Sequence, residues 1–338
     1  MGILDFKNKV VVVTGASAGL GRAVAREFGK SGATVALIAR GVDGLNAGVK
    51  EVENLGGKAK AYIVDVANAD DLETTARNIE SELGPIDTWV NNAMVGVFGP
   101  LKKMEAKDFK RVTEVTYLGQ VYGTMAALKY MMPRNKGNII LVGSALAYRG
   151  IPLQSAYCGS KHAIHGFFES LRSELIHDNS EIKLSMVQLP AMNTTQFGFV
   201  KSYLPNKPQP MGRIFEPEVA ARAIVHLALH PQRELYVGYP TVQTIVGNKL
   251  IPGYLDKYLA KTGFKGQQTN EPTDPERKNN LYEPIAGDHG AHGNFEAQSW
   301  DVSPEVWAAT HKAITLGSIA VLGIGIAWLI SKKIFSKI

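Results

Sequence analysis

Short apolar runs alternate with longer amphipathic stretches through the first 190 residues of the chain. The runs Val10–Val13 and Ile139–Val142 are continuously apolar, which is typical of strands buried on both faces of a parallel sheet. The six predicted strands are Val10–Thr14, Thr34–Ala39, Ala61–Val64, Thr88–Asn91, Asn138–Val142 and Lys183–Leu189. The predicted helices include Arg22–Gly29, Asp70–Leu83, Lys107–Met132, Ser155–His177 and Glu216–His230. This alternation predicts an α/β fold with a doubly wound parallel sheet, which binds ligands beyond the carboxyl ends of its strands.

The pattern changes after the last of these helices. Residues 265–305 are polar, contain few aliphatic side chains and carry several proline and glycine residues, so we expect an extended or partly disordered spacer. We therefore divide the chain into an α/β domain (1–262), a polar spacer (263–306) and a C-terminal hydrophobic helix (307–338).

The run Ala313–Ile330 contains 18 residues without a charge. As a helix it would be about 27 Å long, close to the roughly 30 Å of hydrocarbon in a bilayer. We expect it to attach the protein to a membrane, with the α/β domain in the cytoplasm. Two alternatives stay open: the helix lies in the membrane interface, or it packs on the domain or across a dimer.

Charge and cysteine content narrow the class of protein. The net charge is +6, and four lysines (312, 332, 333 and 337) lie in a tail without acids, which leaves 6 − 4 = +2 for the rest. A nucleic-acid-binding face is therefore not indicated. Cys158 is the only cysteine, so no intrachain disulfide can form, and the chain suits a reducing compartment.

A glycine-rich stretch from Thr14 to Gly21 joins the first predicted strand to the first helix. Its glycines let the backbone turn tightly and approach a phosphate without obstruction by Cβ atoms. The start of the helix directs free N–H groups and the positive end of its dipole toward the same place. The stretch therefore predicts a dinucleotide site, whose candidate residues are Gly15, Ser17, Ala18, Gly19, Leu20 and Gly21.

The spacing Gly-x₃-Gly-x-Gly resembles that of the short-chain dehydrogenase/reductase family, and further landmarks over roughly residues 5–240 agree with it. Asp65-Val66 stands where the family contacts adenine, and Asn91-Asn92-Ala93 stands where it lines the cofactor cleft. Ser144, Tyr157 and Lys161 have the spacing of its catalytic residues. The resemblance implies hydride transfer between a nicotinamide cofactor and a carbonyl or secondary alcohol carbon. Asp65, Val66, Asn91 and Ala93 are accordingly expected to contact the cofactor.

The residue that ends the second predicted strand bears on the choice of cofactor. An acid there would bind the 2′-hydroxyl of NAD, whereas this chain has Ala39-Arg40. A guanidinium can hold a 2′-phosphate by charge-assisted hydrogen bonds. We therefore favour NADP(H) over NAD(H), although Asp43 is a candidate ribose ligand and Ala18 replaces the basic residue of many NADP-binding relatives.

Tyr157 and Lys161 lie four residues apart on one predicted helix, hence on one face. A tyrosine can serve as acid or base near neutral pH only if its pKa falls from about 10, and the lysine is placed to lower it. The resemblance implies that Lys161 also binds the nicotinamide ribose and that Ser144 holds the substrate oxygen. Where the family has a fourth catalytic residue, asparagine, this chain has Thr116.

The region after the sixth predicted strand also departs from the family pattern. Thr194 is expected to contact the nicotinamide carboxamide, with Thr195 as an alternative. The loop Asn193–Phe215 is rich in aromatic residues, which suggests either an apolar, lipid-like substrate or packing within the loop or an oligomer interface.

A second function class is kept beside the enzyme: a dinucleotide-binding sensor or scaffold without turnover, for which the threonine at 116 is the main argument. We expect a small-molecule substrate, a homo-oligomer and no nucleic-acid partner. We expect no metal site, because His289 and His292 have no second cluster of matching spacing.

Overall fold

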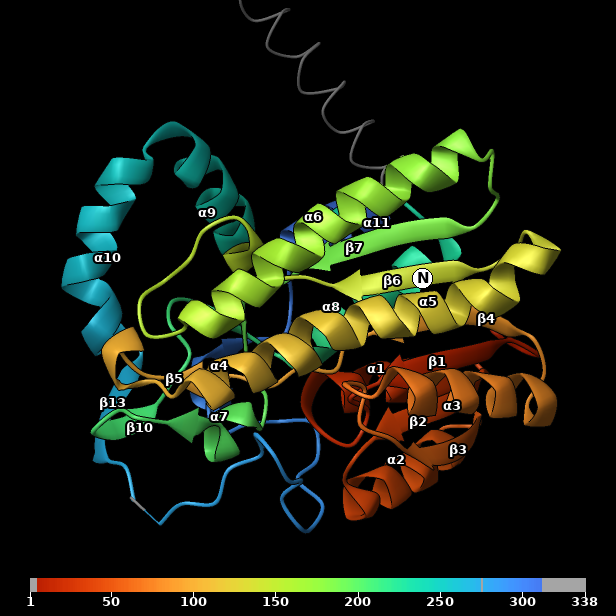
Figure 1. Cartoon of the computed structure of the whole chain (residues 1–338), viewed down its shortest axis with the longest axis horizontal. Helices are drawn as coiled ribbons and strands as arrows, with labels where there is room; N and C mark the ends of the chain where they lie inside the picture. The colour runs from red at the N-terminus through yellow and green to blue at the C-terminus, as the bar shows by residue number, and fades with distance from the viewer. Residues whose placement is uncertain (1–4, 275, 312–338) are drawn as a thin grey trace, which may run out of the picture.

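The computed structural model describes residues 5–274 and 276–311. Its centre is a seven-stranded parallel sheet in the order β12-β7-β6-β4-β1-β2-β3 (Figure 1). The strands are β1 (Val10–Thr14), β2 (Thr34–Ala39), β3 (Lys58–Ile63), β4 (Ile86–Asn91), β6 (Asn138–Val142), β7 (Lys183–Gln188) and β12 (Glu234–Tyr236). The chain starts at β1, winds outward to β3 and returns to β4 on the other side of β1. The predicted doubly wound parallel sheet is confirmed, with its switch point between β1 and β4.

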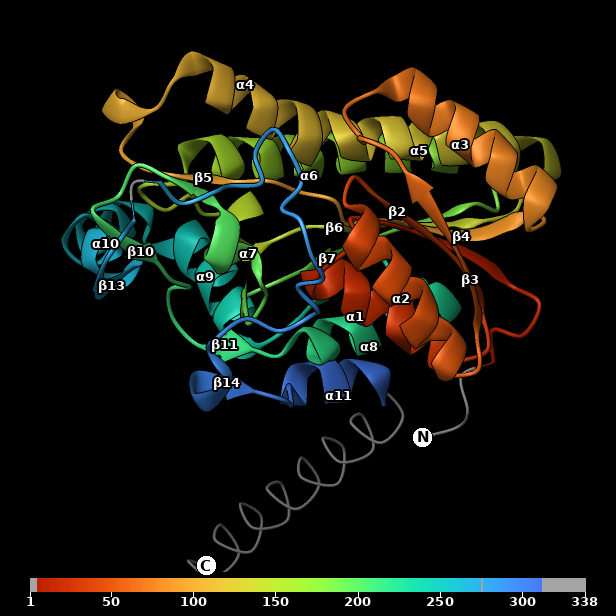
Figure 2. The ribbon, with the colours of Figure 1, turned by 90° about the horizontal axis from the view of Figure 1, so that it is seen from below.

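Two layers of helices cover the sheet (Figure 2). Alternate residues of β1 supply the two cores: Val11 and Val13 face one, and Val10 and Val12 face the other, because successive side chains of a strand point to opposite faces. The first layer contains α1 (Gly19–Lys30), α2 (Val42–Asn54), α8 (Pro217–Leu229) and α11 (Pro304–Thr310). The second contains α3 (Ala69–Glu82), α4 (Ala106–Thr113), α5 (Gly119–Met131) and α6 (Ser155–His177).

Several predicted boundaries shift in the structure. The predicted helix Lys107–Met132 is interrupted by one π-helical turn, Glu114–Leu118, between α4 and α5. Such a turn adds a residue to the helical repeat and often marks a functional site. β3 begins at Lys58, three residues before the predicted start, because this edge strand exposes alternate side chains and its apolar pattern is broken. The short strand β12 gave no clear signal in the sequence.

Beyond the carboxyl ends of the strands, α9 (Tyr239–Leu250) and α10 (Pro252–Gly266) project from the body of the molecule (Figure 1). The short helix α7 (Gln196–Phe199) lies between β7 and α8 in the chain. Three small sheets surround this region. Their strands are β5 (Val97–Phe98) with β9 (Lys201–Ser202), β10 (Asn206–Pro208) with β13 (Gln268–Pro272), and β8 (Ala191–Met192) with β11 (Ile214–Phe215) and β14 (Ser299–Trp300).

The structure corrects the expectation that residues 265–305 form an extended or partly disordered spacer. β13 pairs with β10 and β14 pairs with β11, so both ends of the segment join strands of the domain. Between them, Leu281 is fully buried. The segment needs few aliphatic residues because backbone hydrogen bonds hold much of it in place. The proposed boundary after residue 262 falls inside α10.

The predicted membrane segment Ala313–Ile330 lies outside the described residues. Among residues 5–274 and 276–311, no helix combines the length and the apolar character needed to cross a bilayer.

Candidate active site

The glycine-rich turn between β1 and α1 forms a tight backbone cradle. Gly15 and Gly19 have φ angles of +69° and +56°, which other residues rarely adopt. A Cβ atom on Gly21 would lie 2.2 Å from the carbonyl oxygen of Gly15. The residue before α1 is Ala18, which has no side chain able to cap the helix, and the first turn of α1 holds no acid. This arrangement suits an anion such as a pyrophosphate.

The chain after β4 packs against this cradle. The side-chain amide of Asn92 donates to the Thr14 carbonyl at 2.9 Å, and the Ala93 N–H donates to the Thr14 hydroxyl at 3.0 Å. Asn91, which we expected to contact the cofactor, turns the other way. It accepts a hydrogen bond from the Trp89 indole and donates one to Thr124, both at 3.0 Å. Asn91 therefore holds α5 on the sheet, and Asn92 lines the cavity instead.

Ser144 and Tyr157 meet beyond the end of β6. The Ser144 hydroxyl lies close enough to the Tyr157 phenol to lower its pKa, and it accepts the Leu146 N–H at 3.1 Å. The Ser144 N–H donates to the side-chain carbonyl of Gln188 at 2.8 Å, which fixes the turn that carries the serine. Burial raises the pKa of the Tyr157 phenol, and the Ser144 hydroxyl opposes that rise. At neutral pH the phenol is protonated and able to donate a proton.

Lys161 lies one helical turn after Tyr157 on α6 and is 1% exposed. Its ammonium donates to the Val142 carbonyl at 2.7 Å and lies 5.5 Å from the centre of the Tyr157 ring. Burial lowers the pKa of Lys161 to about 7. Because this value is near neutrality, small changes in the surroundings of the ammonium would change its charge.

One cavity joins these residues to the glycine cradle. It has a volume of about 750 Å³ and contains Ser144, Tyr157 and Lys161 in its wall. The predicted cofactor residues that line it are Gly15, Ser17, Ala18, Gly19, Leu20, Gly21, Ala93, Tyr157, Lys161 and Thr194. Thr195 lines it too, so both candidate threonines face the same space.

A second, narrower pocket of about 120 Å³ adjoins the first at the ends of β2 and β3. Arg40, Asp65 and Val66 line it, as the sequence predicted for the adenosine side of the site. The Arg40 guanidinium donates to two backbone carbonyls of the C-terminal segment, those of Asn280 at 2.6 Å and Tyr282 at 2.5 Å. Asp65 forms an ion pair with Arg111, so the carboxylate next to Arg40 is already balanced.

The structure does not place Thr116 in the cavity. This residue lies in the π-helical turn and is fully buried. Its hydroxyl donates to the Val95 carbonyl at 2.8 Å and accepts the Val95 N–H at 3.1 Å. The expected place of its hydroxyl in a proton relay is therefore not supported by the geometry, and its role is to hold the chain that follows β4.

Comparisons with known proteins agree with this geometry. A family model described as short chain dehydrogenase matches residues 9–202. A relative from Bacillus subtilis (strain 168), described as "Uncharacterized oxidoreductase YxnA", is 32% identical over 97% of this chain and 91% of that protein. The chain belongs to the short-chain dehydrogenase family.

The matching proteins indicate what this dehydrogenase does in general terms. Estradiol 17-beta-dehydrogenase 11 of Pongo abelii is 30% identical over 68% of this chain and 74% of its own. A metagenomic short-chain oxidoreductase in complex with NADP superimposes with a TM-score of 0.59 and 29% identity, over 69% of this chain and 97% of that one. An alcohol dehydrogenase from Thermococcus sibiricus, complexed with 5-hydroxy-NADP, gives a TM-score of 0.58 and 28% identity, over 68% and 95%. The protein is an NAD(P)-dependent oxidoreductase acting on CH–OH groups.

Sequence reasoning missed the outer half of this dehydrogenase's cavity. That half is formed by α9 and α10, which follow the recognisable motifs, and by two side chains near the start of α6. Its residues include Arg149, Gln154, Gln243, Thr244, Tyr254 and Leu259. The apolar, aromatic periodicity of residues 239–259 was the available signal, but it does not distinguish a cavity wall from a packed helix.

Replacing Thr116 by valine tests its structural role. Thr116→Val leaves the buried N–H and carbonyl of Val95 without their partner, so we expect a loss of about 1–3 kcal/mol in the free energy of unfolding. Thr116→Ser keeps the hydroxyl and should lose much less. Chemical denaturation of the three proteins measures both effects. If Thr116→Val is as stable as the native chain but much slower in turnover, the hydroxyl takes part in the reaction.

Proposed function

We propose that this dehydrogenase transfers hydride between NADP(H) and a carbonyl or secondary alcohol carbon of an apolar substrate, with Tyr157 as acid or base. The observation that carries the proposal is the single cavity in which Tyr157, Ser144 and Lys161 face the glycine cradle. A dinucleotide held at that cradle would extend from the adenosine pocket toward the phenol. The bound nicotinamide would supply the hydride acceptor or donor.

The chain's own residues supply the proton and the orientation. The Ser144 hydroxyl and the Tyr157 phenol line the same cavity and form a pair of donors for one carbonyl oxygen of the substrate. In reduction, Tyr157 donates its proton to that oxygen as the alkoxide forms, and in oxidation the phenolate takes the proton back. The Lys161 ammonium, held by the Val142 carbonyl, is placed to stabilise the phenolate by its charge.

Two observations support NADP(H) over NAD(H). Arg40 ends β2 at the adenosine pocket, where the family's NAD-binding members are expected to have an acid. Its guanidinium has five N–H groups, and the two carbonyl contacts leave others free to hold a 2′-phosphate. The two matching structures named above contain NADP or a hydroxylated NADP.

The walls of the cavity support an apolar substrate. Phe197, Phe199, Val200 and Met211 of the loop after β7 line it, together with Tyr254 and Leu259 of α10. Leu204, Ile214 and Phe215 of the same loop are buried, which fits the alternative that part of the loop is packing. A bulky apolar secondary alcohol, the class to which estradiol belongs, would suit the apolar side chains that line the cavity.

Turnover by the purified full chain tests the function. Ketones and aldehydes of increasing apolar size are offered with NADPH, and the matching secondary alcohols with NADP⁺, while the absorbance of the reduced nicotinamide is followed. We expect kcat/KM to rise with apolar size. Tight binding of NADPH without turnover of any compound would instead favour the sensor or scaffold.

We also propose that the uncharged run Ala313–Ile330 attaches the dehydrogenase to a membrane, and that the protein is a homo-oligomer. The length and composition of the run support the attachment. We expect the full chain to sediment with membranes and to need detergent, whereas a version ending at Thr310 stays in the supernatant. If both proteins stay in solution without detergent and the shorter one unfolds more readily, the run packs on protein.

A further inference from the structure

A C-terminal segment, residues 277–293, crosses the adenosine side of the cofactor site. We call it the strap. In Figure 2 it runs, in blue, past α7 and the start of α1 before the chain reaches β14. Along this course Asn280 donates its N–H to the Phe199 carbonyl at 3.0 Å, and the Gly290 carbonyl accepts the Gly19 N–H at 2.9 Å. The strap therefore reaches from the loop Asn193–Phe215 to the glycine cradle.

The middle of the strap forms one wall of the adenosine pocket. Arg40, Asp65 and Val66 line the pocket from the sheet, and Pro284, Ile285 and His289 line it from the strap. The strap is tied to the sheet side at both edges of this wall. The Arg40 guanidinium binds the carbonyls of residues 280 and 282, and the Asp43 carboxylate accepts the Gly287 N–H at 2.7 Å. Asp43, a candidate ribose ligand in the sequence, is therefore a strap anchor.

A buried arginine links the strap to the glycine cradle. Arg22 of α1 is fully buried, and its guanidinium donates to the carbonyls of Ser17 at 3.1 Å and Gly44 at 2.5 Å. The same nitrogen lies 3.3 Å from the Asp288 carboxylate. One guanidinium thus contacts the cradle, α2 and the strap, so the position of the strap is coupled to the shape of the phosphate site.

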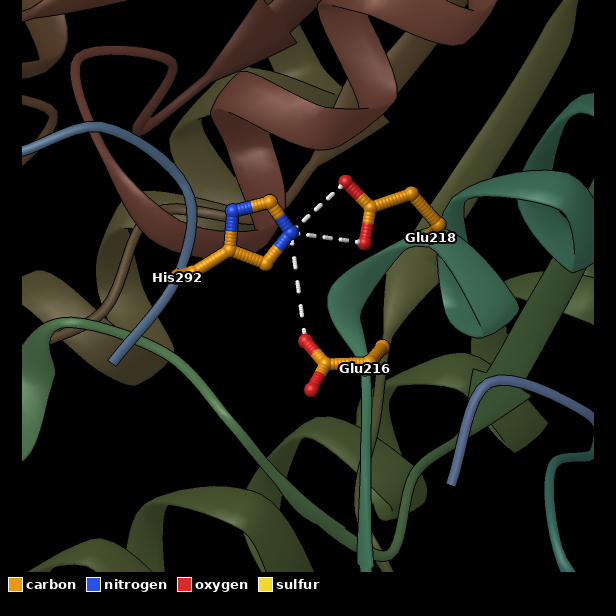
Figure 3. A group of neighbouring side chains, drawn as sticks. All are labelled: Glu216, Glu218 and His292. Carbon is orange, nitrogen blue, oxygen red and sulfur yellow. Dashed lines mark hydrogen bonds and ion pairs between the residues drawn. The ribbon is translucent and has the colours of Figure 1, made fainter. Parts of the chain in front are cut away.

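The far end of the strap is held by His292, which lies between two carboxylates (Figure 3). Its Nε2 is 3.0 Å from Glu218 and 3.8 Å from Glu216. These three side chains are close enough to share a cation. Glu216, however, already accepts the Asn193 amide at 3.0 Å, and the Arg26 guanidinium lies 3.9 Å from Glu218. Protein groups already contact both carboxylates, so we interpret the cluster as a fastening for the strap.

The strap also contacts the loop Asn193–Phe215, which lines the substrate cavity. The Arg277 guanidinium donates to the backbone carbonyls of Phe197 and Val200, on either side of the end of α7. The rings of His289 and Phe199 meet edge to face, with centroids 5.3 Å apart. Both Phe199 and Asn280 line the substrate cavity and the adenosine pocket. Movement of the strap would therefore displace this loop as well.

We propose that the strap is the outer wall of the adenosine subsite, and that the dinucleotide enters and leaves only when the strap lifts. This inference rests on the proposed function, since it takes NADP(H) as the ligand. The pocket behind the strap has a volume of about 120 Å³, and the strap residues Pro284, Ile285 and His289 form its wall opposite Arg40 and Asp65. Because Arg40 binds the strap, the strap also positions the guanidinium that would meet the 2′-phosphate.

A reversible disulfide tests the proposal. A Cβ atom on Gly41 would lie 3.5 Å from the Cβ of Pro284, a separation found in disulfides. Gly41 has an ordinary φ of −86°, so it accepts a side chain, and the native Cys158 is buried. The double variant Gly41→Cys/Pro284→Cys is loaded with NADPH in its reduced form and then oxidised. Excess NADP⁺ is added, and release is followed by the fluorescence of the reduced nicotinamide.

We expect the oxidised variant to release NADPH at least about tenfold more slowly than the same protein after reduction. The native chain treated with oxidant and the single variant Gly41→Cys control for other effects of oxidation. Equal release rates with the disulfide demonstrably formed would overturn the proposal. If instead the native chain does not bind NADPH at all, that result contradicts the proposed function rather than the proposal about the strap.

A second variant serves if the disulfide does not form. Asp43→Ala/Asp288→Ala removes two strap anchors whose side chains line neither pocket. We expect faster release of both NADPH and NADH, because the strap lifts more often. An unchanged release rate would also overturn the proposal.

Discussion

The variant Tyr157→Phe is expected to lose turnover by about 10²–10⁴-fold while it keeps nearly native affinity for NADPH. The phenol oxygen is the group placed to exchange a proton with the substrate oxygen, and phenylalanine removes it with little change of volume. Its ring would still pack in the cavity wall near Lys161, so the cofactor side of the cavity should keep its shape. Turnover is measured with the best substrate of the carbonyl panel, and affinity by titration with NADPH.

A control separates the loss of this phenol from a general effect of losing a tyrosine. Tyr130→Phe removes a phenol from α5 at a position that lines neither pocket, and it should leave turnover within about twofold of native. If Tyr157→Phe keeps more than about a tenth of the native rate, another group donates the proton. Loss of NADPH binding together with turnover would point to a structural role for the phenol.

The variant Arg40→Asp is expected to weaken NADPH binding by about 30-fold or more and to shift the preference toward NADH. The substitution replaces a phosphate donor by a carboxylate, which repels a 2′-phosphate and can accept a 2′-hydroxyl. Titration of both cofactors into the native and variant proteins measures the change. Because Arg40 also binds the strap, the same substitution weakens the hold on residues 280 and 282.

Comparing the two cofactors separates these effects. A looser strap changes the binding of NADPH and NADH alike, whereas loss of the phosphate partner changes only that of NADPH. Arg40→Lys is the matched control, since it keeps the positive charge but cannot bind the two strap carbonyls in the same way. An NADPH to NADH preference that is the same in Arg40→Asp as in the native protein would remove the main support for NADP(H).

Much of the fold and of the reaction centre could be predicted from the sequence because the determining features are local. The continuous apolar run of β1 leads directly into the glycine turn and the start of α1, so three adjacent segments define the cradle. Tyr157 and Lys161 share a helix face because they are four residues apart, whatever surrounds the helix. Ser144 could be added only by resemblance, since it lies thirteen positions before Tyr157, across a loop.

The sequence alone thus determined the parallel sheet, the cradle and the pairing of Tyr157 with Lys161. The tertiary structure decided which of two adjacent asparagines enters the cavity, because the partner of Asn91 is Thr124 on a helix 33 residues away. It also decided that the Thr116 hydroxyl binds the Val95 backbone. Above all, it placed the strap against Arg40, about 240 residues earlier in the chain. All three contacts join groups that are distant in the chain, and two of them end on a backbone carbonyl. Neither periodicity nor composition records the position of a backbone carbonyl.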